Sequence, residues 1–248
     1  MQPLNDEEEM FFKRIYSIKE NAINNYKITT LKFLDLRKQD IIKYIVGNDC
    51  YLYFDGGYDE AEYKKCIISP FEIDNPDFKI IKLKLNYNKK FLELNHRKVL
   101  AVLMELGLKR EVFGDILFNG SDVYIMSSSE NVEYIKSNLR LISHNPVEVI
   151  EYDGKIENVI NFKEEKLFVS SMRLDTIISA TYNVSRTISQ ELIKSNKVKV
   201  NHTEILNNNH ELKVHDIVSV RGKGRFKVGE LLGTSKSDRI VLKVFKYV

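Results

Sequence analysis

Residues 77–153 follow one regular succession of strand and helix patterns, and this succession restricts the fold more than any other feature of the chain. The spacing of the apolar residues separates strands from helices, and Asn119-Gly120 is a strong signal for a hairpin turn. We predict strands over residues 78–85, 112–118, 123–126 and 147–152 and helices over residues 97–106 and 131–141. The resulting β-α-β-β-α-β order is typical of ferredoxin-like and RNA-recognition-motif (RRM) folds.

Patterns on either side of this segment predict two further domains. The N-terminal side predicts helices over residues 6–26 and 37–46 and strands over residues 51–54 and 66–68. The C-terminal side predicts a pair of helices, a strand at Val198 and Val200 and short strands over residues 217–220, 226–228 and 240–245, after a polar connector over residues 153–165. We therefore expect an α+β protein with an N-terminal α/β domain over residues 1–75, a ferredoxin/RRM-like middle domain over residues 76–155 and a third domain over residues 168–248.

The composition excludes several classes of protein. With 43 % hydrophobic and 29 % charged residues the chain has the profile of a globular protein, and no apolar run approaches the roughly 20 residues that a membrane span needs. The acidic N-terminus is unlike a secretory signal, and Cys50 and Cys66 lack a partner motif, so we expect reduced thiols and a cytoplasmic protein. The spacing of the histidines does not indicate a metal site, and the sequence has no glycine-rich strand-to-helix turn that would indicate a cofactor.

The charges divide the chain into two parts. Residues 169–248 hold 14 Lys+Arg against 7 Asp+Glu, whereas residues 1–168 hold 24 against 28. A chain with a formal net charge of +3 therefore combines an acidic front part with a basic C-terminal part. This asymmetry predicts that the C-terminal part binds a polyanion.

Three elements of the basic part carry residues suited to phosphate. A helix predicted to start near Ser185 offers backbone N–H groups without internal partners beside Arg186. The next strand alternates apolar and basic side chains, and residues 221–225 form a predicted loop whose glycines let the backbone approach a phosphate. The candidate contacts are Arg173, Ser185, Arg186, Gln190, Lys194, Lys197, Lys199, Asn201, Arg221, Lys223, Arg225 and Lys227.

The motifs of the chain resemble those of a known family. The segments Arg173-Leu174-Asp175, Ser185-Arg186 and Val198-Lys199-Val200-Asn201 are similar to the S4-type (αL-like) RNA-binding domain, in which two helices and a strand hold structured RNA by its backbone. Upstream, the chain resembles the YlmH family of S4-type proteins at two motifs. The first is Phe54-Asp55-Gly56-Gly57-Tyr58, and the second, central motif includes His96-Arg97 and Phe113-Gly114-Asp115-Ile116.

The resemblance implies a ribosome-associated RNA-binding factor, with a quality-control role on the large subunit. Its partners would be structured RNA (rRNA and tRNA) and the ribosome, without specificity for DNA. Three residues of the middle domain are secondary candidates for RNA contact, namely His96, Arg97 and Arg110. No catalytic residue is expected.

Two other classes of function stay open. An RNA-modifying enzyme, similar to a pseudouridine synthase or a methyltransferase, would use the S4-type domain to bind its substrate, and Arg173-Leu174-Asp175 matches the surroundings of a pseudouridine synthase's catalytic aspartate. The residues that follow lack the rest of that motif, so we expect Asp175 to make intradomain hydrogen bonds or to start a helix. A protein-binding scaffold that uses the acidic front part is the third class.

Overall fold

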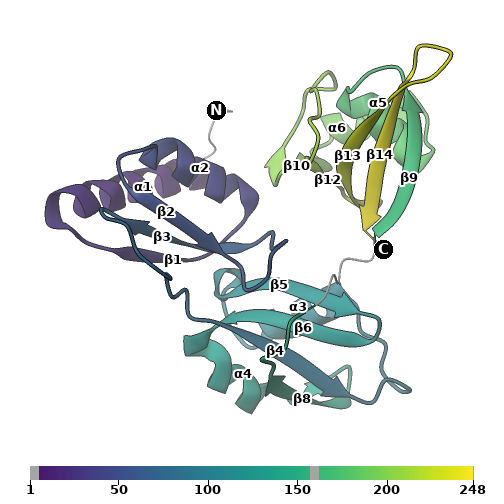
Figure 1. Ribbon diagram of the computed structural model, residues 1–248. Helices are drawn as coiled ribbons and strands as arrows, with labels where there is room; N and C mark the ends of the chain where they lie inside the picture. The colour runs from purple at the N-terminus through teal and green to yellow at the C-terminus, as the bar shows by residue number, and fades with distance from the viewer. Residues whose placement is uncertain (1–5, 157–161, 248) are drawn as a thin grey trace. The chain divides into compact units, whose positions relative to one another are not determined.

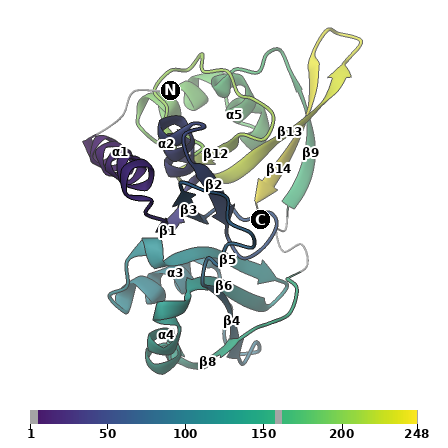
Figure 2. The ribbon, with the colours of Figure 1, turned by 60° about the vertical axis from the view of Figure 1, so that its left-hand side comes forward.

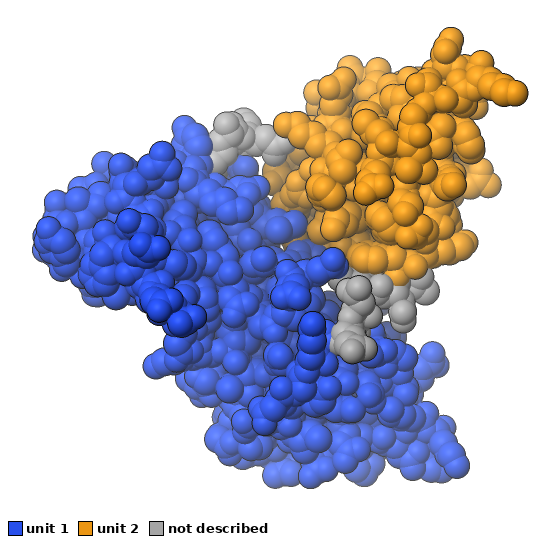
Figure 3. Space-filling model, in the orientation of Figure 1, with its two compact units in different colours: residues 1–159 blue, residues 160–248 orange. Residues whose placement is uncertain are grey.

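The computed structural model describes residues 6–156 and 162–247. The chain divides into two compact units, unit 1 over residues 1–159 and unit 2 over residues 160–248 (Figure 3). The fold is α+β, as predicted, and three antiparallel sheets form its framework. None of the helices within the described ranges is long and apolar enough to cross a membrane. This two-unit division does not test the predicted domain boundaries near residues 75 and 155, which stay a prediction.

The N-terminal half of unit 1 packs two helices on one face of a three-stranded sheet (Figures 1 and 2). Its elements are α1 (Asp6–Asn25), β1 (Thr29–Leu34), α2 (Leu36–Val46), β2 (Tyr51–Asp55) and β3 (Lys64–Ser69). Asp35 starts α2 by accepting a hydrogen bond from the Lys38 N–H at 2.9 Å. Ile15, Ile41 and Ile68, one from each of α1, α2 and β3, are fully buried and join these three elements in one core.

The sequence patterns missed β1, which pairs with β3 through an irregular register. The shift between Leu31 and Leu34 lets this strand bury Leu31 and Leu34 in the helix-side core and Phe33 in a second cluster. A strand that buries side chains on both faces loses the strict alternation by which strands are recognised.

The C-terminal half of unit 1 has the predicted order of elements, with one short strand added. Its elements are β4 (Ile80–Tyr87), α3 (His96–Glu105), β5 (Phe113–Asn119), β6 (Asp122–Ser128), α4 (Val132–Asn138), β7 (Leu141–Ile142) and β8 (Asn145–Glu151). The sheet order is β5-β6-β4-β8-β7. Gly120 makes the β5–β6 turn with a φ of 56°, which confirms the predicted hairpin. The helix α4 ends at Asn138 rather than near residue 141, because Leu141 already pairs with β8.

Two segments with glycines, residues 54–58 and 113–116, hold the two halves of unit 1 against each other. The Asp115 carboxylate on β5 accepts hydrogen bonds from the Tyr58 hydroxyl and the Glu62 N–H, both at 2.7 Å. Next to it Gly114 has no room for a side chain, because a Cβ there would lie 2.7 Å from the ring of Phe33. Lys65 adds a buried link by donating to the Phe78 carbonyl at 3.0 Å. These motifs therefore hold the sheets of unit 1 together.

Unit 2 is built on a six-stranded sheet with α5 and α6 on one face (Figure 1). Its elements are β9 (Phe162–Val169), α5 (Leu174–Tyr182), α6 (Arg186–Lys194), β10 (Val198–Val200), β11 (Thr203–Glu204), β12 (Ile217–Val220), β13 (Gly224–Thr234) and β14 (Ile240–Tyr247). The sheet order is β11-β10-β12-β13-β14-β9. Phe226, Val228 and Val244 are fully buried beneath the helices.

Two predictions for this region were wrong. Within the predicted connector, residues 157–161 lie outside the described residues, but residues 162–165 belong to β9. This strand lies at the sheet edge, where charged residues such as Glu164 and Glu165 are typical, and so its sequence gives little apolar signal. The predicted loop over residues 221–225 is shorter than expected, because Gly224 and Arg225 already pair with β12.

Replacing Tyr58 by phenylalanine tests the contact with Asp115. Burial raises the pKa of Asp115 while the donated hydrogen bonds oppose that rise, so the loss of one donor leaves a buried carboxyl less well satisfied. We expect Tyr58→Phe to lower the free energy of unfolding by about 2 kcal/mol in urea titrations. Tyr44→Phe, at a side chain that is 65 % exposed, is the matched control and should change little. Equal stability of the two variants would contradict the proposed link.

Candidate nucleic-acid interface

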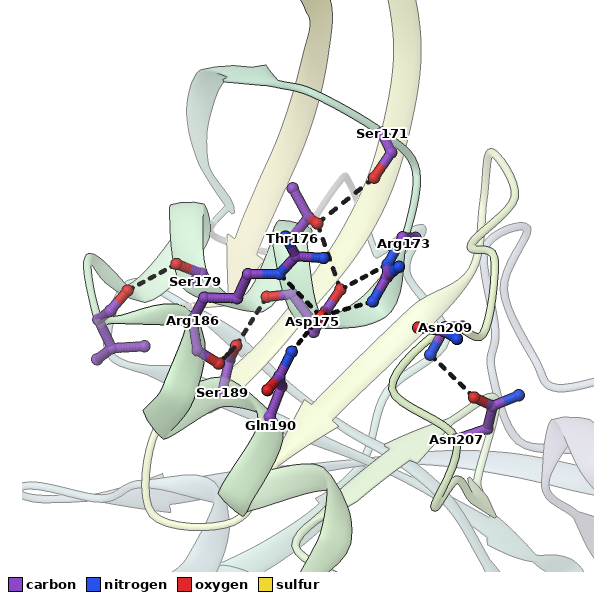
Figure 4. A network of polar contacts seen from close by, with 11 residues as sticks. Ser171, Arg173, Asp175, Thr176, Ser179, Arg186, Ser189, Gln190, Asn207 and Asn209 are labelled. Atoms are coloured by element: carbon purple, nitrogen blue, oxygen red, sulfur yellow. Dashed lines mark hydrogen bonds and ion pairs between the residues drawn. The ribbon is translucent and has the colours of Figure 1, made fainter.

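A buried carboxylate organises the helix pair of unit 2 (Figure 4). Asp175, in the first turn of α5, is completely buried. Arg173 donates to both of its oxygens, Nε to Oδ1 at 3.1 Å and a terminal nitrogen to Oδ2 at 3.0 Å. From α6, Arg186 Nε and the Gln190 amide donate to Oδ2 at 3.0 and 2.9 Å. One carboxylate thus fixes three of the predicted contact residues, and the predicted intradomain role of Asp175 is confirmed.

The charges at this network leave a local excess of positive charge. Burial would raise the pKa of Asp175, but the hydrogen bonds from Arg173, Gln190 and Arg186 outweigh it and hold the pKa well below its ordinary value. The carboxylate is therefore ionised and faces two guanidinium groups. The Arg186 side chain is 54 % exposed and the Arg173 side chain 31 % exposed, so both also reach solvent. Such an arrangement can hold one phosphate beside two oriented cations.

The turn between the helices directs the start of α6 toward solvent. Asn183 ends α5 in the left-handed conformation with a φ of 51°. Ser185 caps α6 by accepting the Ile188 N–H at 3.2 Å, and Ser185 and Arg186 are both exposed. Behind them the buried Ser189 hydroxyl lies 2.8 Å from the carbonyl oxygens of Asp175 and Arg186. The sequence analysis missed Ser189. Its spacing of one helical turn from the buried Ile193 places it on the buried face of α6, where its hydroxyl can bond to α5.

A second group of cations comes from three segments of unit 2. Lys194 ends α6, Lys197 precedes β10, and Arg221 and Lys223 lie in the turn between β12 and β13, and all four are exposed. The Arg221 N–H donates to the Lys197 carbonyl at 2.8 Å and so places that turn beside the start of β10. This bond brings Arg221 close to Lys197, and the contact of these four cations with RNA stays a prediction.

Other predicted contacts lie elsewhere. Lys199, Arg225 and Lys227 project from the sheet face opposite the buried valines, and Lys199 pairs with Glu204 at 3.4 Å. The Asn201 amide is used within the fold, because it donates to Asp216 at 2.8 Å and accepts the Ile217 N–H at 2.9 Å. Lys199, Arg225 and Lys227 therefore lie on the sheet face away from α5 and α6, and their contact with RNA stays a prediction.

The secondary candidates lie in unit 1. His96 and Arg97 form the exposed start of α3, where Asn95 caps the helix by accepting the Lys98 N–H at 2.9 Å. Arg110 instead donates to the Phe113 carbonyl at 2.6 Å, and its guanidinium carbon lies 3.9 Å from the ring centre of Tyr63. Arg110 is thus partly used in holding unit 1 together. Among the residues that the structure describes, no group of His, Cys, Asp and Glu could hold a metal ion.

Comparisons with known proteins show which families and solved structures the chain resembles. The family described as "Putative RNA-binding domain in YlmH" matches residues 74–155, and the S4 domain family matches residues 172–218. The Ribosome-associated protein quality control protein P2 of Bacillus subtilis (strain 168) is 31 % identical over 243 residues, covering 96 % of this chain and 95 % of that protein. Among solved structures, Cell division protein ylmH from Streptococcus pneumoniae has a similar fold, with a TM-score of 0.53 and 21 % identity over 61 % of this chain and 94 % of that chain.

Replacing Asp175 by asparagine removes the charge that orients Arg173 and Arg186. At neutral pH we expect a loss of about 2 to 3 kcal/mol of unfolding free energy, since the exposure of Arg186 softens the cost of breaking a buried pair. Because the folded state lowers the pKa from its usual 3.8, this stabilisation is present above pH 3.8 and is lost as the pH falls below it.

Urea titrations at several pH values measure this difference between the wild type and Asp175→Asn. The gap between the two proteins should shrink as the pH falls below about 4. The control Asp238→Asn changes an exposed turn residue of the same unit and should behave as the wild type. A gap that is independent of pH would argue against an ionised Asp175.

Proposed function

Because the chain belongs to the YlmH family of S4-domain RNA-binding proteins, we propose that it is a ribosome-associated factor that binds structured RNA through unit 2. A relative that is 31 % identical over nearly its whole length is named as a ribosome-associated quality control protein, which supports the same process for this chain. We propose a cytoplasmic localisation, because ribosomes translate in the cytoplasm.

The observation that carries this proposal is the set of cations oriented around the α5–α6 turn and the start of β10. Asp175 holds Arg173 and Arg186 in place, and the backbone bond between Arg221 and Lys197 gathers the second group. Fixed guanidinium and ammonium groups bind phosphates in a set geometry, as recognition of RNA by shape requires. The proposed contacts are Arg173, Ser185, Arg186, Gln190, Lys194, Lys197, Arg221 and Lys223.

We propose that the bound RNA is rRNA and tRNA on the large subunit. We also propose that the C-terminal half of unit 1 belongs to the ferredoxin/RRM-like fold class. Numbering the four long strands β4, β5, β6 and β8 from 1 to 4, the sheet order 2-3-1-4 supports this class. The exposed start of α3, with His96 and Arg97, is the proposed secondary contact of unit 1.

We propose binding without catalysis. The pseudouridine synthase alternative needs an aspartate that reaches a nucleotide, but Asp175 is completely buried and accepts hydrogen bonds from Arg173, Arg186 and Gln190. A carboxylate held in this way orients its neighbours rather than attacking a substrate.

Replacing Lys197 by glutamine tests the proposed surface. Each lysine that neutralises a phosphate releases counterions, so its loss weakens binding and makes the dependence of the logarithm of affinity on the logarithm of salt concentration shallower by about one unit. The measurement is the affinity for 23S rRNA fragments and tRNA over a series of salt concentrations. Lys236→Gln removes the same charge from an exposed turn of unit 2 outside the proposed surface and serves as control.

The two lysine variants should differ in their salt slope as well as in affinity. The Lys197→Gln protein should also leave the ribosomal fractions of a sedimentation gradient, while Lys236→Gln stays in them. Identical effects of the two substitutions would mean that RNA binding depends on the overall charge of unit 2 and not on the proposed surface. Absence of the wild-type protein from every ribosomal fraction would sink the ribosomal assignment.

Nucleoside mass analysis tests the absence of catalysis. We expect rRNA and tRNA from cells with the protein and from a deletion strain to carry the same set of modified nucleosides. A modification that occurs only when the protein is present, and that Asp175→Asn abolishes without loss of RNA binding, would establish the enzyme alternative.

A further inference from the structure

The sheet of unit 2 has a second face, which the helices leave uncovered. On β14, Leu242 and Val244 are fully buried under α5 and α6, so Lys243, Phe245 and Tyr247 project to the opposite side. We call this side the outer face. Its character is set by the strands on either side of β14, namely β13 and β9.

Three aromatic rings gather on the outer face and fix one another. Tyr247 lies directly across from Phe162, and their ring centres are 4.9 Å apart at an interplanar angle of 77°. Phe245 lies 5.5 Å from Phe162 at 55°. Such tilted and edge-to-face contacts favour defined ring orientations, and all three rings are partly exposed. The cluster therefore presents ordered aromatic surface to its surroundings.

Cations alternate with these rings. The guanidinium carbon of Arg225 lies 4.7 Å from the ring centre of Tyr247, and Lys243 Nζ lies 5.2 Å from that of Phe245. Lys227 is the cross-strand neighbour of Phe245 on β13. Glu164 forms an ion pair with one of these cations, Lys243, at 3.0 Å. The outer face thus combines aromatic rings with basic side chains.

We propose that the outer face of unit 2, centred on Phe162, Arg225, Phe245 and Tyr247, is a stacking surface for unpaired RNA bases. An aromatic ring and a guanidinium plane both stack on a base, and the neighbouring lysines neutralise the adjoining phosphates. An apolar protein partner would gain nothing from the cations and would have to desolvate them. The inference rests on the proposed function and adds to it a second RNA contact, which reads single-stranded nucleotides where the helix side binds the backbone of structured RNA.

A single introduced tryptophan reports on this stacking, because the chain contains no tryptophan. In the full-length Tyr247→Trp protein, addition of an unstructured oligouridine should quench the fluorescence as bases stack on the new ring. Tyr44→Trp, at the 65 % exposed position on α2, is the matched control and should not respond. In the protein without an introduced tryptophan, Tyr247→Ala should weaken oligouridine binding about tenfold, whereas Tyr247→Phe should retain it.

The outcomes separate this inference from the proposed function. If Lys197→Gln weakens binding of structured RNA while Tyr247→Trp shows no quenching by oligouridine, the outer face is not a base-binding surface and the helix-side surface stands. If the new tryptophan resists quenching by iodide before RNA is added and does not respond to RNA, protein covers the face and the inference is overturned. If the wild type binds no RNA at all, the proposed function fails as well. Matching thermal unfolding of all variants excludes misfolding as the cause of any loss.

Discussion

The ion pairs of the buried Asp175 carboxylate are the interaction on which the candidate interface depends. One charged group inside unit 2 joins the start of α5 to the start of α6 through Arg173, Arg186 and Gln190. An unpaired carboxylate that is completely buried would be strongly unfavourable, so the fold needs the two arginines. Both arginines also reach solvent, where a ligand can contact them. The stability of unit 2 and the proposed binding of RNA therefore depend on the same side chains, and we expect a substitution of Arg186 to affect both.

The order of elements in unit 1 could largely be predicted from the sequence, because short stretches of sequence identify its turns and helices. Asn119-Gly120 required a tight turn, and α3 and α4 carried clear helical spacing. The strands β1 and β9 escaped because their sequences reflect tertiary surroundings: a register shift buries both faces of β1, and the edge position of β9 tolerates its glutamates. Local patterns do not contain that information.

The residue types of the candidate site were also predictable, but their grouping was not. The alternation of Val198, Lys199 and Val200 already required that the basic side of β10 face away from whatever covers the valines, and α5 and α6 cover them. Arg225 was expected in a loop because two glycines flank Lys223, yet Gly224 pairs with Val220 and draws Arg225 into the sheet. The register, which the sequence does not show, thus places Arg225 and Lys227 within the sheet rather than in a loop.

The pairing of β9 with β14 has a mechanical consequence. Phe162 and Tyr247 are direct partners, so the first and last described residues of unit 2 lie at the same end of one antiparallel pair. Tension applied between these ends would load the hydrogen-bonded pairs one after another rather than all at once, as in the opening of a zipper. The aromatic contact of 4.9 Å between these two rings lies at the point where opening must begin. Unit 2 should therefore open from this end first, one pair of residues after another.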